Sequence, residues 1–139
     1  MANVPDTNAL HELTRDECEQ LLTTVPLGRL GFVFAGQPVI LPVNFVWLDG
    51  EILFRTFTGQ KFGSAQAHQR VAFEVDDWDR ELRSGWSVLV KGRAEPVIEW
   101  ERARVADSMG HEPWTDSELA EPWVRIVPRD VTGRRVGAP

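Results

Sequence analysis

The sequence has no tyrosine and a single cysteine, Cys18, among its 139 residues. Without tyrosine, no phenolic side chain can act as a general acid. One cysteine excludes an intrachain disulfide, which is typical of a reducing compartment, and we expect a cytoplasmic protein. No apolar run approaches the roughly 18 residues that a spanning helix needs, and residues 1–7 carry no signal-peptide pattern. We therefore expect neither membrane insertion nor secretion.

Lysine is also scarce, since Lys61 and Lys91 are the only two, and the formal net charge is −6. A negative chain argues against nonspecific nucleic-acid binding, which needs a broad basic face. Hydrophobic residues make up 42% of the sequence, which is typical of a globular protein. With no linker or low-complexity tract, residues 1–139 are expected to form a single domain.

The signatures of several common sites are missing. Three histidines and one cysteine, dispersed along the chain, do not form a zinc motif. The run from Gly59 to Ser64 lacks the spacing of a P-loop, and no G-x-G-x-x-G follows a predicted strand. The acidic run at 77–81 lacks the glycine of a calcium loop. We expect no metal site.

Apolar residues alternate along most of the chain, which predicts a mainly β protein with short helices. Thr14 and Glu17 form a capping box that starts a helix, and Asp49-Gly50 predicts a hairpin turn. The expected helices span 14–24, 60–68 and 99–109; the expected strands span 30–34, 39–46, 52–57, 71–76, 86–97 and 124–127. Residues 77–85 are expected to form a polar loop, 110–122 an irregular segment and 132–139 a frayed tail. Strand number and spacing favour a small barrel.

The stretch from Arg55 to Lys61 could hold a phosphate group. It lies where a strand is expected to end and a helix to begin, and a helix start presents free N–H groups. Arg55 offers a planar fork, Thr56 a hydroxyl and Lys61 a point charge. Gly59 permits close approach of the backbone. The alternative is a polar strand end with a capping threonine and two solvated cations.

Two further stretches could contact a planar ligand. Pro42-Val43-Asn44 lies within an apolar strand, and proline implies an edge or an interrupted strand because it cannot donate to a ladder. Trp86-Ser87 places an aromatic ring beside a hydroxyl at the start of a long strand. The alternatives are an edge strand with one exposed asparagine, and a tryptophan that simply packs in the core.

Taken in order, these stretches resemble the FMN-binding split β-barrel family of the pyridoxamine-phosphate oxidases. The resemblance covers residues 14–98 and extends toward Arg135. The matching segments are Leu27-Gly28-Arg29-Leu30, Gly36-Gln37-Pro38, Pro42-Val43-Asn44, Phe54-Arg55-Thr56, Gly59-Gln60-Lys61, the stretch 70–76 and the stretch 85–95. The resemblance implies a six-stranded antiparallel split β-barrel that pairs as a homodimer, with a flavin in each of two interfacial clefts.

The resemblance also implies roles for individual residues. The flavin phosphate would be held by Arg55, Thr56 and Lys61, with Phe62 counted among the cofactor-binding residues. Backbone at Pro42, Val43 and Asn44 would lie along the isoalloxazine ring. Ser87, with Trp86 beside it, would approach the ring, either from the same subunit or from the other one. Vitamin B6 oxidases grip their substrate phosphate with further C-terminal residues, and only Trp123 and Arg125 stand in a loosely similar setting here.

The first functional hypothesis is an FMN-dependent oxidoreductase that moves hydride to or from a small molecule. The flavin carries that chemistry, so no catalytic side chain is expected. The alternatives are a 5-deazaflavin-dependent reductase on the same fold, for whose acidic tail Arg15 and Arg29 are candidate ligands, and a non-enzymatic flavin- or haem-binding module. Six tryptophans and seven phenylalanines exceed what a small barrel can enclose, which also favours a homodimer.

Overall fold

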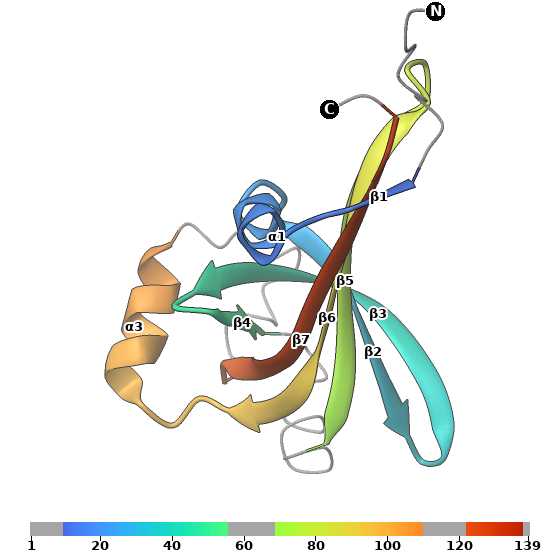
Figure 1. Ribbon diagram of the computed structural model, residues 1–139. Coiled ribbons are helices and arrows are strands. Elements are labelled where there is room, and N and C mark those ends of the chain that lie inside the picture. Colours follow the sequence, from blue (N-terminus) through green and yellow to red (C-terminus); the bar gives the residue numbers. More distant parts are fainter. Residues whose placement is uncertain (1–9, 56–68, 110–121, 138–139) are drawn as a thin grey trace, which may run out of the picture.

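The computed structural model describes residues 10–55, 69–109 and 122–137. Figure 1 shows a small β-barrel with one helix at its end and another on its side. The elements are β1 (Leu10–Glu12), α1 (Arg15–Leu22), β2 (Leu27–Phe34), β3 (Gln37–Leu48), β4 (Glu51–Phe54), β5 (Arg70–Asp79), β6 (Ser84–Pro96), α3 (Trp100–Ser108) and β7 (Val124–Val136).

All described strands belong to one antiparallel sheet in the order β1-β7-β4-β3-β2-β5-β6. An additional pairing of β6 with β7 closes six of these strands into a barrel, and β1 is attached to the outer side of β7. The expected six-stranded antiparallel split barrel is thus confirmed. The short β1 was not expected, because three exposed residues carry no periodic signal.

Side-chain alternation separates a core face from an outer face. The core-facing side chains of the barrel include Leu30, Phe45, Phe73, Val88 and Val90, all of which are buried. The residues between them point outward, because successive strand residues face opposite sides. We call this second side the outer face, and its members include Val33, Ile40, Pro42, Trp78 and Ser87.

The two helices within the described residues are held by local signals and by apolar contacts. Thr14 and Glu17 form the predicted capping box at the start of α1, and Leu22 and Cys18 of that helix are buried in the barrel core. α3 covers a separate apolar cluster through Ala106, which packs with Leu53 of β4 and Trp123.

Turn chemistry explains the hairpins. Asp49 and Gly50 both adopt positive φ, at 49° and 78°, as the predicted Asp-Gly turn between β3 and β4 requires. Ala35 and Gly36 make the same kind of turn between β2 and β3, with φ values of 50° and 76°.

Two predictions about loops were wrong. The expected polar loop at 77–85 is largely strand, because Asp77, Trp78 and Asp79 pair with β6 as far as Ser84. The expected frayed tail is strand as far as Val136, with β6 on one side and β1 on the other. Both segments are too polar to show alternation, and ladder hydrogen bonds to neighbouring strands order them instead.

The expected helix at 60–68 lies outside the described residues. The expected irregular segment at 110–122 also lies outside them, except for residue 122. Within the described ranges, no helix has the length and apolar character needed to cross a bilayer. The same ranges hold no cluster of three histidine, cysteine or acidic side chains that could bind a metal.

Candidate functional site

Among the described residues, the segment Pro42–Asn44 of β3 has no pairing partner on the side where Arg55 lies, and we call this side the open edge. β3 pairs with β2 along residues 37–44 but with β4 only from Phe45 to Leu48. The pair Phe45 and Phe54 is the last one between β3 and β4. One step further, Arg55 lies opposite Asn44, so the fold brings these two predicted site segments together.

The direction of the backbone groups follows from one hydrogen bond. The Phe45 N–H donates to the Pro26 carbonyl at 3.1 Å, so it points toward β2. Backbone groups alternate sides along a strand, so those of Val43 also point to β2, whereas those of Asn44 and Pro42 point to the open edge. Pro42 therefore costs the ladder no hydrogen bond. The predicted edge is confirmed, and β3 is not interrupted.

The open edge offers the Asn44 N–H and the Pro42 carbonyl, whereas the register directs the Asn44 carbonyl to the Arg55 N–H. No described residue pairs with β3 on this side before Phe45. Asn44 is only 6% exposed, and its side chain donates through Nδ2 to the Pro26 carbonyl at 3.3 Å. This bond fixes the segment that precedes β2 against β3. The alternative of an exposed asparagine is therefore wrong.

Arg55 follows the end of β4 and is held by one acidic and one aromatic neighbour. Its Nη2 donates to Oδ1 of Asp107 in α3 at 2.9 Å, and its guanidinium carbon lies 4.6 Å from the centroid of the Trp123 ring. Trp123 Nε1 donates to the same Asp107 oxygen at 2.9 Å. The Arg55 side chain is 13% exposed, so this charge is partly shielded and its orientation is set.

The Trp86 and Ser87 pair divides between the two faces of the sheet. Trp86 is 8% exposed and packs in the barrel core with Val43, as the packing interpretation predicted. Ser87 is half-buried on the outer face, directly opposite Asp76 of β5. Only the serine hydroxyl faces away from the core.

Acidic side chains lie between Pro42 and Ser87 on the outer face. Arg29 of β2 is paired across strands with both Pro42 and Glu74. Its Nη1 contacts Glu74 Oε1 at 3.1 Å and Asp76 Oδ2 at 3.0 Å. Burial, reinforced by the hydrogen bond and charge of Asp76, raises the pKa of Glu74 to about 7, although Arg29 opposes the shift.

This pKa gives the first testable prediction. Between pH 4.5 and about 7, folded Glu74 holds a proton that the unfolded chain releases, so stability falls as pH rises through that window. The Glu74 side chain is 35% exposed, and solvent screening limits the effect to about 1 kcal/mol. Urea unfolding of wild type and Glu74→Gln at pH 5 and pH 8 measures it. The prediction fails if the two proteins lose the same stability between these pH values.

Three predicted site residues, Thr56, Lys61 and Phe62, lie outside the described residues. Sequence reasoning missed Asp107 and Glu74 as neighbours of the site. Asp107 stands on an otherwise ordinary polar helix, so no local signal marks it. Glu74 and Asp76 lie on the same face of β5, next to Arg29 of β2. That relation can be recognised only once it is known that β2 and β5 are paired.

Comparison with known proteins adds an independent finding. The sequence profile of the pyridoxamine 5'-phosphate oxidase family matches residues 14–135. An uncharacterised protein of Mycobacterium tuberculosis, Rv0080, is 39% identical over 132 residues, which cover 91% of this chain and 86% of that protein.

Two solved structures are similar as well. A FAD-binding protein from Mycobacterium smegmatis has 37% identity and a TM-score of 0.68, with 91% of this chain and 98% of that chain covered. A FAD-binding protein from Mesorhizobium loti has 26% identity and a TM-score of 0.69, with 92% and 99% covered.

Proposed function

The chain belongs to the pyridoxamine 5'-phosphate oxidase family, and from this we propose that it binds a flavin and transfers hydride to or from a small-molecule substrate. The observation that carries the proposal is the open edge of β3 at Pro42 and Asn44, which lies immediately beside Arg55. A flavin phosphate has a planar ring and an anionic group. The ring would lie along the open edge, and the phosphate would lie at Arg55.

The residues of the open edge and Arg55 fit a flavin. The pyrimidine edge of an isoalloxazine ring carries both hydrogen-bond donors and acceptors, and the edge of β3 offers the Asn44 N–H together with the Pro42 carbonyl. The Asn44 side chain ties this edge to the segment before β2, which reduces the ordering needed on binding. Arg55 is oriented by Asp107 and supplies a charge for the phosphate, with Thr56 and Lys61 completing the clamp.

FMN is the proposed cofactor, because the clamp from Arg55 to Lys61 accounts for a single phosphate. The two similar structures named above are of FAD-binding proteins, and FAD contains the same phosphate, so it would use the same clamp. A 5-deazaflavin coenzyme needs further cations for its acidic tail. The two candidates, Arg15 and Arg29, are already ion-paired with Glu19 and with Glu74 and Asp76.

Ser87 enters the proposal through a second subunit. Pro42 and Ser87 lie on β3 and β6, which are separated by β2 and β5. Three steps of about 4.8 Å between strands, with an offset of two residues along β6, place them roughly 16 Å apart on the sheet. One ring cannot readily contact both from one chain, which supports the homodimer with shared clefts that the family resemblance implies.

When bound, the flavin supplies the hydride chemistry at its ring. The chain's own contribution is to bind the phosphate, align the ring along β3 and shape the surroundings of the ring. No catalytic side chain is proposed. The substrate is proposed to differ from pyridoxamine phosphate, because only Trp123 and Arg125 stand in a setting loosely similar to that of the residues with which vitamin B6 oxidases grip their substrate phosphate. The cytoplasm is the proposed location.

The visible spectrum of the purified protein, before and after addition of FMN, tests the proposal. We expect a bound flavin spectrum, with an affinity in the micromolar range or tighter, and bleaching of the flavin by a hydride donor. A protein that binds no flavin contradicts the proposal. A flavin that no hydride donor reduces would instead favour the non-enzymatic binding module.

Dimer formation is tested separately. Trp78 is 57% exposed on the outer face, where its ring covers Gly85. Burying such a ring between subunits would stabilise a dimer, so Trp78→Glu is expected to weaken association by tenfold or more. Light scattering at micromolar concentration measures the mass. Trp100→Glu is the matched control, because Trp100 is 64% exposed on α3, away from that face. A monomeric wild-type protein contradicts the prediction.

A further inference from the structure

We propose that a second site, a cationic groove beside the β2–β3 hairpin, binds the diphosphate of a nucleotide. The groove has a volume of about 940 Å³. Its basic side chains are Arg70, Lys91, Arg93 and Arg129. It shares no residue with the proposed flavin site, so it goes beyond that function.

The charge of the groove contrasts with that of the chain. Four basic side chains line it, and Asp130 is the one acidic side chain among the lining residues, although the chain carries a net charge of −6. Within the part of the chain that the structure describes, none of the four cations forms an ion pair or a hydrogen bond with another side chain. By contrast, Arg29, Arg55 and Arg125 are all engaged.

The register of the strands places two of these cations directly opposite each other. Arg70 of β5 is the cross-strand partner of Arg93 of β6. Like charges in this arrangement destabilise a sheet, so the folded protein keeps the pair at a cost. A multiply charged anion between the two guanidinium forks would remove that repulsion, and paired forks suit phosphate oxygens. Lys91 lies two residues along β6, which is about 6.6 Å, and extends the charge along the groove.

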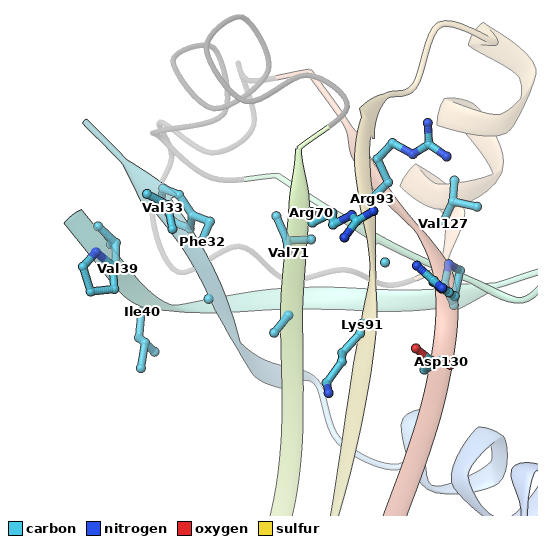
Figure 2. Close-up of a pocket in the computed structure, with 16 residues that line it drawn as sticks. Phe32, Val33, Val39, Ile40, Arg70, Val71, Lys91, Arg93, Val127 and Asp130 are labelled. Atoms are coloured by element: carbon cyan, nitrogen blue, oxygen red, sulfur yellow. The ribbon is translucent and has the colours of Figure 1, made fainter. Parts of the chain in front are cut away.

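The opposite wall of the groove is apolar. Figure 2 shows Phe32, Val33, Val39 and Ile40 on the β2–β3 side, and Arg70, Lys91 and Arg93 on the β5–β6 side. A ligand that fits both walls needs a flat apolar part next to a compact, multiply charged part. A nucleoside diphosphate has this form, and the groove lies within the size range of small-ligand sites.

Two sources would present this chemistry: the nucleotide end of FAD itself, or a separate nucleotide such as a hydride donor. Isothermal titration of the full-length protein with ADP, with and without added FMN, tests the site without any enzyme assay. We expect ADP to bind. The double variant Arg70→Gln/Arg93→Gln should weaken ADP by roughly 100-fold, since each charged phosphate contact contributes about tenfold. Binding should also weaken as salt is raised.

The matched control is Arg80→Gln/Arg83→Gln, which removes the same charge at the far end of the β5–β6 hairpin, and it should change ADP binding less than twofold. Titrations with FAD identify the source. If the groove variant weakens FAD but leaves FMN unchanged, the groove holds the nucleotide end of FAD. If ADP still binds when FAD is bound, the groove takes a separate nucleotide.

Three results overturn the proposal: no ADP binding to wild type, equal binding by wild type and the groove variant, or a groove variant whose main effect is loss of a dimer. The melting temperature is the second measurement. Because Arg70 and Arg93 repel each other, the ligand-free groove variant should melt at the wild-type temperature or above it. A large decrease would assign the arginines a structural role and would also contradict the proposal. Failure to bind FMN leaves the ADP result unaffected, so the two proposals fail independently.

Discussion

Gly92→Ala is expected to lower the free energy of unfolding by about 3 kcal/mol, the upper part of the usual range for overpacking. A Cβ at this position would overlap the Val127 carbonyl oxygen and lie 2.9 Å from the Val127 carbonyl carbon. Both are backbone atoms of β7, so no side-chain rotation can relieve the clash. Gly92 also lies next to a register shift between β6 and β7, where Arg129 is the extra residue. The longest pairing of the barrel must therefore deform.

Gly31→Ala is the matched control. Gly31 also lies within a paired strand, but a Cβ there would have its nearest neighbour at 3.7 Å, which is ordinary contact. Its stability should be unchanged or slightly higher, because alanine restricts the unfolded chain. Thermal unfolding by circular dichroism should show a decrease of about 10 °C for Gly92→Ala and less than about 3 °C for Gly31→Ala. Equal melting temperatures for the two variants would mean that β7 can move away at little cost.

Arg55→Ala and Lys61→Ala are each expected to weaken FMN binding by about tenfold to 100-fold, because each removes a charged contact with the phosphate, worth roughly 1.5–3 kcal/mol. Riboflavin lacks the phosphate, so wild type and both variants should bind it nearly equally. Quenching of flavin fluorescence during titration measures both affinities. Identical FMN affinities in wild type and both variants would show that the clamp has been misassigned.

Arg55 also stabilises the fold, and the experiment must separate that role from binding. Its ion pair with Asp107 and its position over the Trp123 ring link β4 to α3 and β7. Asp107→Asn keeps Arg55 and an acceptor for Trp123 Nε1 but removes the ion pair. We expect it to weaken FMN binding less than Arg55→Ala. If Arg55→Ala weakens riboflavin and FMN to the same extent, its effect is structural and the phosphate assignment fails.

The local pattern of the chain determined the type of most elements. Alternation at Leu30, Val43, Phe73 and Val88 reflects burial on one side of a strand, and burial requires only the period of the strand itself. The capping box at Thr14 and the turn at Asp49-Gly50 depend on residues within a few positions of one another. These predictions succeeded because the interactions that decide them are local.

Predictions failed where a distant strand supplies the order. Trp78 and the residues from Thr132 to Val136 carry little periodic signal, yet they are strand because β6 pairs with both segments. The buried state of Asn44 depends on the Pro26 carbonyl, eighteen positions earlier in the chain. No window of neighbouring residues contains these partners.

By itself, the sequence determined that the chain is a mainly β protein with apolar alternation, and it carries the ordered segments that place it in its family. Only the tertiary structure decided that the open edge of β3 lies beside Arg55 and that Asp107 and Trp123 hold that arginine. It also decided that Arg70 of β5 lies opposite Arg93 of the neighbouring strand β6. The physical reason is that alternation specifies which side of a strand is buried, whereas the pairing of strands specifies which residues become neighbours.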